Sequence, residues 1–517
     1  LPEKLEAASA AGFDAVEIFE PDLLSWPEPP TVVAQRARDL GLAIAISQPF
    51  RDPDATEPAG LARSVHRMHR KCEVTRALGC DLLLVCSSVH AGAVRDDDEL
   101  AAQLRVLAEV AAGHGVRLAY EALAWGAHVA DYRHAQRLVD AVDHPSLGTC
   151  VDSFHVLSRG DDPGDIAKIP AEKLFFYQVA DAPQLSMDVL PWSRHHRCFP
   201  GQGAFELVGF HEAVLATGYR GPVSLEVFND LFRQIDPRTT ALDGMRSLRH
   251  LADRVARRAA RKGLGEADSS AVALPSAPAP VSWAFVEIAT SPESAGAVTG
   301  LLQQLGFSRN GLHRGGAVDL FSHGDVRVVV NQRDPDVALE VSSLGFRTAS
   351  PHVLHDRARE LLAPVVHRAV GPGETEIPSL VAPDGTWIQF CGASAPGAPD
   401  WLDDFLSLPA RSDVDPSLDV GGPLFTGIDH VALPQKFGGF DTAALFFSSV
   451  LGLEAAAPSE IPGPEGLVRS RPLISPNGAV RIVLNVAPTA AMLRGQPLDA
   501  GHVAFSTTDA IAAAQAF

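Results

Sequence analysis

Short apolar runs rich in β-forming residues alternate with helical patterns through residues 1–230. The apolar runs are 13–19, 42–47, 81–86, 116–120, 147–151, 174–179 and 222–227. The helical patterns are 1–12, 31–41, 61–79, 97–115 and 131–143, and several end in the glycine that often follows a last helical turn. Because apolar strands that alternate with helices form a parallel sheet covered by helices, this pattern restricts residues 1–230 to an α/β fold.

The number of strands separates the two common α/β architectures. A (β/α)₈ TIM barrel has eight strands in roughly 250 residues, whereas the chain shows seven strand patterns and opens in a helix. A doubly wound sheet would place a GxGxxG motif after an early strand, and the sequence has none there. We therefore predict a TIM barrel over residues 1–262 whose first strand precedes Leu1.

The remainder of the chain, after residue 262, shows a different pattern of predicted strands and helices. Residues 263–280 are rich in Ala, Pro and Ser, which is typical of a linker. Two rounds of short strands and helices follow, in residues 281–392 and 425–517, and WAFVEIATSP of the first round aligns with IDHVALPQ of the second. SSLGFRTAS aligns in the same way with GHVAFSTTD. We predict an α+β domain over 281–517 built from duplicated βαβββ units.

Composition excludes several classes of partner. The 517 residues include 43 Lys and Arg against 63 Asp and Glu, a net charge of −20, which disfavours nucleic-acid binding. No apolar run approaches the roughly 20 residues of a membrane span, and no signal peptide is present. The six cysteines form no CxxC pair, so we expect free thiols in a reducing cytoplasm. The sequence leaves homo-oligomer formation open.

Oxygen-bearing side chains close the last four strands of the predicted barrel. They are Glu121, Asp152, Gln178 and Glu226. One such carboxylate could cap a helix or form an ion pair at the barrel rim, but four in succession meet at the carboxyl end of the strands, where barrel active sites lie. A cluster of this kind is unfavourable without a cation. It predicts a hard divalent ion, Mg²⁺ or Mn²⁺ first and Co²⁺ as a further choice.

Several segments, in order, carry a family resemblance: EIFE, SQPFRD, YEALAW, VDSFH, YQVADA and HHRCFPGQG. They resemble the xylose-isomerase-like (AP-endonuclease-2) barrel superfamily and, within it, the bacterial 3-dehydroshikimate dehydratases. The resemblance implies that Glu121, Asp152, Gln178 and Glu226 are the metal ligands. Sugar isomerases of this superfamily usually carry His where this chain has Gln178, and its DNA endonucleases have more His ligands. That departure favours the dehydratases.

The resemblance implies a lyase that dehydrates 3-dehydroshikimate to protocatechuate in quinate and shikimate catabolism. A metal ion would stabilise the developing enolate, while a base and an acid move protons. His155, three residues after Asp152, suits either proton role, its alternative being a structural loop residue. The anionic substrate needs a cation, and Arg51 and Arg197 are the candidates, with rim ion pairs as their alternative. Ser193 is a candidate hydroxyl contact.

Two histidines define a second candidate metal site, in the C-terminal domain. His430 and His502 lie in matching strand patterns of the second round, and two His with one carboxylate hold Fe²⁺ in non-haem oxygenases. The segments IDHVALP and GHVAFSTTD resemble the vicinal-oxygen-chelate fold of the 4-hydroxyphenylpyruvate dioxygenases. The resemblance implies Fe²⁺ or another divalent ion, with a third ligand, a Glu, expected beyond residue 517. The corresponding positions of the first round are Phe285, Ser343 and Gln389, which cannot hold iron.

Other functions stay open at this point. A sugar or hydroxypyruvate isomerase or epimerase could use the same barrel, and would need a neutral polyol pocket. A non-catalytic binding or regulatory protein is the second alternative, and a DNA repair nuclease, disfavoured by the charge, is the third. The activity of the C-terminal domain is undetermined by the sequence, because fold alone does not transfer function.

Overall fold

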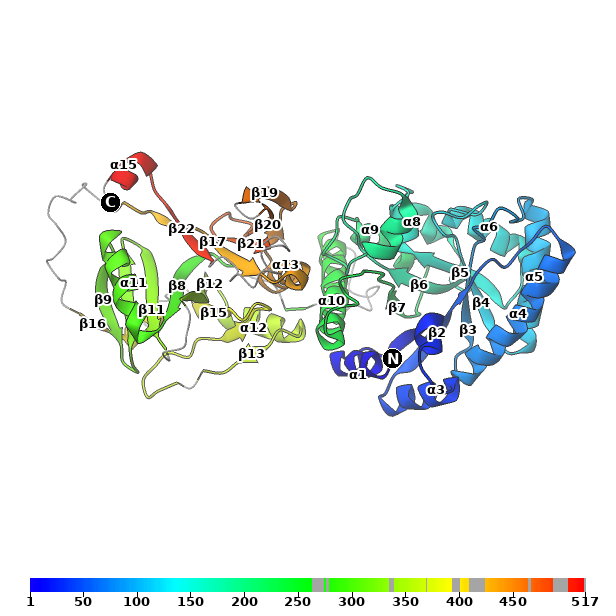
Figure 1. Ribbon diagram of the computed structural model, residues 1–517, viewed down its shortest axis with the longest axis horizontal. Coiled ribbons are helices and arrows are strands. Elements are labelled where there is room, and N and C mark those ends of the chain that lie inside the picture. Colours follow the sequence, from blue (N-terminus) through cyan, green and yellow to red (C-terminus); the bar gives the residue numbers. More distant parts are fainter. Residues whose placement is uncertain are drawn as a thin grey trace. The chain divides into compact units, whose positions relative to one another are not determined.

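The chain forms two compact units, Leu1–Ala273 and Leu274–Phe517 (Figure 1). The computed structural model describes residues 1–262, 274–275, 279–333, 339–368, 370–392, 400–408, 424–463, 466–486 and 501–515. Most of the predicted linker, 263–280, lies outside these residues. No helix in the described ranges is both long and apolar enough to cross a membrane.

The first unit is built on seven parallel strands whose order in the sheet follows their order in the chain. They are β1 (Ala15–Phe19), β2 (Ala43–Phe50), β3 (Leu82–Cys86), β4 (Arg117–Glu121), β5 (Leu147–Asp152), β6 (Leu174–Val179) and β7 (Val223–Leu225). Each strand overlaps one of the predicted runs. The sheet curls until Ser224 of β7 donates a hydrogen bond to Glu17 of β1 at 2.5 Å. The prediction of a TIM barrel is thereby confirmed.

Helices surround the curled sheet. They are α1 (Pro2–Ala11), α2 (Glu20–Leu24), α3 (Pro30–Asp39), α4 (Pro58–Ala77), α5 (Asp97–Gly113), α6 (Tyr132–Val142), α7 (Ser153–Leu157), η1 (Pro163–Lys168), α8 (Val189–His195), α9 (Leu207–Ala216) and α10 (Pro237–Arg261). Side chains of β3 show why the strands are apolar throughout. Leu83 and Val85 pack against the helical layer, while Leu82, Leu84 and Cys86 pack with side chains from the inner face. A strand buried on both faces loses the alternating polar pattern.

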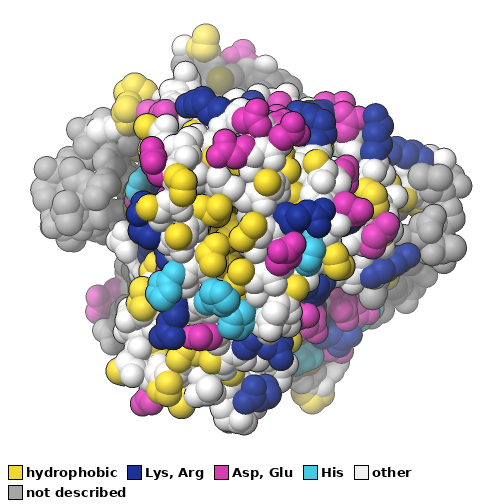
Figure 2. All heavy atoms as spheres, turned by 90° about the vertical axis from the view of Figure 1, so that its right-hand side faces the viewer, with side chains coloured by type: hydrophobic (Ala, Val, Ile, Leu, Met, Phe, Trp, Pro, Cys, Tyr) yellow, Lys and Arg dark blue, Asp and Glu magenta, His cyan; other side chains and the backbone are white. Residues whose placement is uncertain are grey.

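The face of the first unit that carries α4 and α5 is turned towards the viewer in Figure 2. Basic and acidic side chains intermingle over this face. Nucleic-acid binding relies on a concentrated basic surface, and this face does not supply one.

The second unit contains two sheets. The larger has the order β13-β14-β15-β12-β8-β11-β10-β9-β16, and the smaller has the order β18-β20-β21-β17-β22, with β19 paired to β20. The larger sheet comprises β8 (Ser282–Thr290), β9 (Ser308–His313), β10 (Val318–His323), β11 (Val326–Gln332), β12 (Glu340–Thr348), β13 (Val365–Val366), β14 (Ser379–Val381), β15 (Trp387–Gly392) and β16 (Phe405–Ser407). The smaller comprises β17 (Gly427–Gln435), β18 (Glu454–Ala455), β19 (Ser459–Gly463), β20 (Gly466–Ile474), β21 (Arg481–Val486) and β22 (His502–Ser506).

Four helices accompany these sheets: α11 (Pro292–Gln304), α12 (Pro351–Glu360), α13 (Phe440–Leu451) and α15 (Ala510–Gln515). The described part of the unit also contains the short 3₁₀ helices η3 (Trp401–Asp404), which matters below, and η5 (Phe437–Gly439). The strand trio β11-β8-β12 recurs as β21-β17-β22, with one parallel and one antiparallel pairing in each. The predicted α+β duplication is therefore present.

The pairing registers test the residue alignment between the two rounds. β8 and β17 both have nine residues, which places Phe285 at the position of His430. Ser343 pairs with Glu287 of β8, and His502 pairs with Ala432, the matching position of β17. Phe285 and Ser343 thus stand where the second round has its two histidines.

Candidate active site

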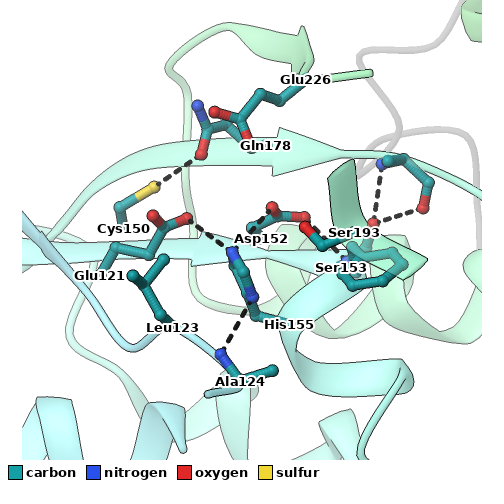
Figure 3. Close-up of polar contacts among 12 residues, drawn as sticks. Glu121, Leu123, Ala124, Cys150, Asp152, Ser153, His155, Gln178, Ser193 and Glu226 are labelled. Atoms are coloured by element: carbon teal, nitrogen blue, oxygen red, sulfur yellow. Dashed lines mark hydrogen bonds and ion pairs between the residues drawn. The ribbon is translucent and has the colours of Figure 1, made fainter. Parts of the chain in front are cut away.

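Four oxygen-bearing side chains lie at the carboxyl ends of neighbouring barrel strands. Glu121 and Asp152 are the last residues of β4 and β5, Gln178 is the last but one of β6, and Glu226 directly follows β7. All four are buried, none more than 8% exposed. Figure 3 shows these side chains gathered in one region. The parallel strands bring together residues that are far apart in the sequence.

Burial makes the charged form of these carboxylates costly. Burial and the charges of Glu226 and Asp152 raise the pKa of Glu121 well above its usual range. Burial also raises the pKa of Glu226, although the Arg197 guanidinium opposes this. Within the described residues, Glu121 Oε1 is a buried atom without a hydrogen-bond partner. Crowded carboxylates with an unpartnered oxygen fit a divalent ion, which prefers such ligands.

The amide of Gln178 is oriented by a residue that sequence analysis missed. Its Nε2 donates to Glu17 Oε2 at 2.7 Å, and its Oε1 accepts a weak hydrogen bond from Cys150 Sγ at 3.5 Å. Gln48 also donates to Glu17, at 2.6 Å. Burial raises the pKa of Glu17 to about 8, and the charge of Glu226 adds to this. An acidic residue inside the apolar run AVEIF was the available signal for Glu17.

Arg197 lies within the carboxylate cluster. It is 1% exposed, and its Nη1 donates to Asp152 Oδ2 at 2.7 Å and to Glu226 Oε2 at 2.9 Å. Its Nη2 donates to Ser193 Oγ at 2.9 Å, and its guanidinium lies 4.5 Å from the ring centre of Phe154. Arg197 therefore compensates part of the buried negative charge, and Ser193 holds it in place.

His155 lies on α7, immediately after β5, and is also buried. Its Nδ1 accepts a hydrogen bond from the Ala124 backbone amide at 3.1 Å, so the neutral ring carries its proton on Nε2. That Nε2 lies 3.6 Å from Asp152 Oδ2 and 3.9 Å from Glu121 Oε1 (Figure 3). Arg197 Nη2, 3.3 Å from Nε2, is itself a donor and makes no hydrogen bond with that N–H. Burial lowers the pKa of His155 to about 3.

Two further arginines lie near the cluster. Arg51, exposed just after β2, lowers the pKa of the Cys86 thiol against the stronger effect of burial. Arg194 of α8, which sequence analysis missed, lies 5.2 Å from the ring centre of Phe228. Burial lowers the pKa of Arg194, and the charge of Arg51 lowers it further. Positive charges that act on each other in this way favour a nearby anion.

The carboxylate cluster does not coincide with the large cavity of the first unit. A hollow of about 440 Å³ lies at the opposite ends of the strands, where its lining includes Leu82, Arg117 and Leu174. These residues begin β3, β4 and β6, whereas the carboxylate cluster lies where strands end. A second group of metal-ligating side chains, Asp97, His128 and His134, lies on the surface of the same unit. There both imidazoles face one oxygen of an exposed carboxylate.

The structure also brings together the two histidines of the second unit. His430 Nε2 and His502 Nε2 are 3.1 Å apart on the paired strands β17 and β22. Asp429 Oδ2 lies 2.7 Å from His430 Nδ1 and accepts from Arg481 at 3.0 Å. A carboxylate on one ring nitrogen directs the other towards a metal. Among the described residues, two groups of three metal-ligating side chains lie close enough together to hold an ion, and both groups are in the first unit. In the described part of the second unit, the candidate site consists of the two imidazoles.

Comparison with known proteins identifies relatives for both units. The family model described as xylose isomerase-like TIM barrel matches residues 5–251. A 3-dehydroshikimate dehydratase of Pseudomonas aeruginosa is 42% identical over 99% of this chain and 82% of its own length. A protein of the same name from Pseudomonas putida is 40% identical over 94% of this chain and 77% of its own.

A solved structure covers both units together. It is described as a xylose isomerase-like TIM barrel/4-hydroxyphenylpyruvate dioxygenase fusion protein, with 37% identity and a TM-score of 0.90. The match spans 100% of this chain and 83% of the other. The vicinal-oxygen-chelate architecture expected for the second unit agrees with this neighbour. By these relationships, which extend over nearly its whole length, the chain belongs to the 3-dehydroshikimate dehydratase family.

Proposed function

We propose that the barrel of this chain is a divalent-metal-dependent lyase that dehydrates 3-dehydroshikimate to protocatechuate. The observation that carries the proposal is the 42% identity to a 3-dehydroshikimate dehydratase over 99% of the chain. It favours this reaction over the isomerase, the non-catalytic protein and the nuclease. The buried carboxylate cluster supports it, because the reaction develops negative charge on a ketone oxygen and needs a cation there.

Glu121, Asp152, Gln178 and Glu226 would hold the metal. Three carboxylates and an amide oxygen are hard ligands that suit Mg²⁺, Mn²⁺ or Co²⁺. A bound ion would supply a Lewis acid for the ketone oxygen of the substrate. Glu17 accepts from Gln178 Nε2 and so orients the amide. Oε1, which accepts a weak hydrogen bond from Cys150 Sγ, would be the atom that faces the ion.

The remaining residues bind substrate and move protons. The substrate loses a proton from the carbon beside its ketone and a hydroxyl from the next carbon, which together leave as water. We assign His155 as the hydrogen-bond donor to the leaving hydroxyl, because the Ala124 amide fixes the ring with N–H at Nε2. Arg51, with Arg194 beside it, would bind the substrate carboxylate. Arg197 bonds to Asp152 of the cluster and to Ser193 Oγ. We propose that both residues also contact the substrate.

Four finer assignments belong to the same proposal. We place the reaction in quinate and shikimate catabolism, and Mg²⁺ first among the candidate ions. A cytoplasmic location fits the six cysteines, all of which are free thiols and buried. For the second unit, we propose a divalent ion, Fe²⁺ first, at His430 and His502.

The test uses the full chain. Metal is removed with EDTA, 3-dehydroshikimate is added, and protocatechuate is followed by its absorbance before and after Mg²⁺, Mn²⁺ or Co²⁺ is restored. We expect turnover to disappear on chelation and to return with at least one of the three ions. Absence of protocatechuate with all three ions would refute the proposal, and turnover that survives chelation would refute its metal dependence.

A further inference from the structure

A cavity of about 250 Å³ lies on one face of the larger sheet of the second unit. Strands β8, β11, β12 and β15 contribute to its floor, and the η3 helix and β16 supply one of its walls. Its lining includes Phe285, Trp387, Trp401, Ser343, Arg333 and Arg368. It is smaller than the roughly 300–1,000 Å³ of sites for drug-sized ligands, so it suits a molecule with one ring.

The cavity occupies the place in the first round that the paired histidines occupy in the second. Phe285 and Ser343 stand at the positions of His430 and His502. Gln389 Nε2 donates to Ser343 Oγ at 2.9 Å, so these two side chains satisfy each other. A side chain at Gly345 would overlap the Phe285 ring, so glycine is what lets this ring lie against the sheet. Where the second round has two imidazoles, the first round has an aromatic ring and a hydroxyl.

Aromatic rings line one side of the cavity. The ring centres of Phe285 and Trp401 are 4.7 Å apart, and Trp401 meets Phe405 edge to face at 5.9 Å. Trp387 of β15 contributes a further ring. Flat apolar surfaces of this kind favour stacking or edge contact with an aromatic ligand.

The acidic and basic side chains of the cavity differ in how many of their hydrogen-bonding groups already have partners. Glu287 Oε1 accepts from Asn331, Arg333 and Ser342 at 2.9–3.1 Å. Both oxygens of Asp404 accept from the Thr375 amide. Arg333 donates to Glu287, and Arg368 donates to the Thr375 carbonyl. Arg368 Nη2 also forms longer ion pairs, 3.8 Å from Glu374 Oε2 and 3.9 Å from Asp404 Oδ2. Each guanidinium has five N–H donors, more than these contacts use. Donors therefore remain for an anionic ligand, while the two carboxylates are engaged.

From this arrangement, we propose that the cavity binds a single-ring aromatic carboxylate. The ring lies among Phe285, Trp387 and Trp401, and the carboxylate accepts from Arg333 and Arg368. This site is separate from the carboxylate cluster of the barrel and needs no metal. The product of the proposed reaction is a ligand of this chemical class, and to that extent its physiological occupant rests on the proposed function.

The test measures binding of benzoate to the metal-free full chain by calorimetry, because benzoate lacks the paired hydroxyls that chelate metals. We expect saturable binding of benzoate, with benzamide, the neutral analogue, at least tenfold weaker. Arg333→Gln with Arg368→Gln should weaken benzoate binding at least tenfold. Ser343→Leu, which fills the cavity and keeps the charges, should weaken it as well. Melting curves identify any variant that fails to fold.

Two controls locate the binding. Arg359→Gln changes an exposed arginine of the same unit and should leave benzoate affinity unchanged. Arg51→Gln, at the barrel, should also leave it unchanged. Benzoate binding that is lost in Arg51→Gln but kept in the double variant would assign the ligand to the barrel and overturn the proposal. Equal affinity for benzoate and benzamide would also overturn it.

This outcome is independent of the dehydratase assay. The Arg333 and Arg368 variant should retain turnover of 3-dehydroshikimate, since neither residue belongs to the barrel. If turnover is absent from the wild-type chain but benzoate binding follows the pattern above, the proposed function fails and the binding site stands.

Discussion

The two units present candidate metal sites that are built in opposite ways. In the barrel, oxygen ligands lie at the ends of parallel strands and are almost wholly buried, the Asp152 side chain being 0% exposed. In the second unit, two imidazoles face each other across antiparallel strands, and the His430 side chain is 24% exposed. Buried carboxylates need a cation, whereas water can solvate part-exposed imidazoles. The barrel site therefore depends on positive charge for its stability, and the histidine pair does not.

The arginines that support the two candidate sites also differ, because one contacts the candidate ligands directly and the other does not. Arg197 enters the barrel cluster and bonds directly to Asp152 and Glu226. In the second unit, Arg481 bonds to Asp429. Asp429 in turn contacts His430 Nδ1. Arg197 compensates buried negative charge, whereas Arg481 holds the carboxylate that contacts a candidate ligand.

Removal of Arg197 tests the dependence of the barrel on positive charge. Arg197→Met leaves buried carboxylates unpaired and should lower the free energy of unfolding of the metal-free chain by about 3–5 kcal/mol. Urea denaturation measures the loss. The control is Arg36→Met, which breaks the exposed pair with Glu6 and should cost less than about 1 kcal/mol. Equal losses in the two variants would contradict the comparison.

Removal of one candidate metal ligand tests which group of side chains serves turnover. Asp152→Asn keeps the shape of the side chain but takes one negative charge from the cluster, and kcat for 3-dehydroshikimate should fall by about 10²–10³-fold. Asp97→Asn, at the surface group with His128 and His134, should leave kcat unchanged. If Asp97→Asn lowers kcat and Asp152→Asn does not, the barrel site has been misplaced.

Acid titration tests a pH dependence of stability that arises from a buried histidine outside both candidate sites. Burial lowers the pKa of His211, outside both sites, to about 4. A folded-state pKa below the unfolded value means that the unfolded chain binds more protons between these values. Stability should therefore be full above pH 6.5 and fall by roughly 3 kcal/mol as pH decreases to 4. His211→Asn, which retains a polar atom near Tyr177, should flatten this dependence in urea titrations. An unchanged slope would exclude His211 as its source.

Loss of an orienting contact is the smallest expected effect. Asp429→Asn leaves His430 and His502 in place but removes the charge behind His430 Nδ1, and should weaken metal binding at the second unit about 10–100-fold. Calorimetric titration with Fe²⁺ under anaerobic conditions, in the Asp152→Asn background, measures it. Turnover in the otherwise wild-type chain should not change. A parallel loss of turnover would mean that the second unit takes part in the dehydration.

The fold could be predicted because its signals are local. Every barrel strand is a short apolar run that can be recognised without knowing its neighbours. The end of the barrel segment at residue 262, where the Ala-, Pro- and Ser-rich stretch begins, stays a prediction, and α10 ends at Arg261.

The candidate site could be predicted only in part. Strand ends identified Glu121, Asp152, Gln178 and Glu226 because barrel geometry brings such positions together. Glu17 was missed because its partners Gln178 and Ser224 lie 161 and 207 residues away. The contacts of Arg197 with the ligand set were missed for the same reason. They depend on how far the sheet curls, which no local pattern records.

The place of Arg197 among the ligands has a consequence for electroneutrality. Glu121, Asp152 and Glu226 together would carry three negative charges when ionised, and Gln178 adds none. A divalent ion alone would leave one negative charge uncompensated, which would repel an incoming acid. With the positive charge of the Arg197 guanidinium added, the net charge of the site would be zero before substrate binds. The barrel of a chain with net charge −20 can thus receive an anion at a locally neutral centre.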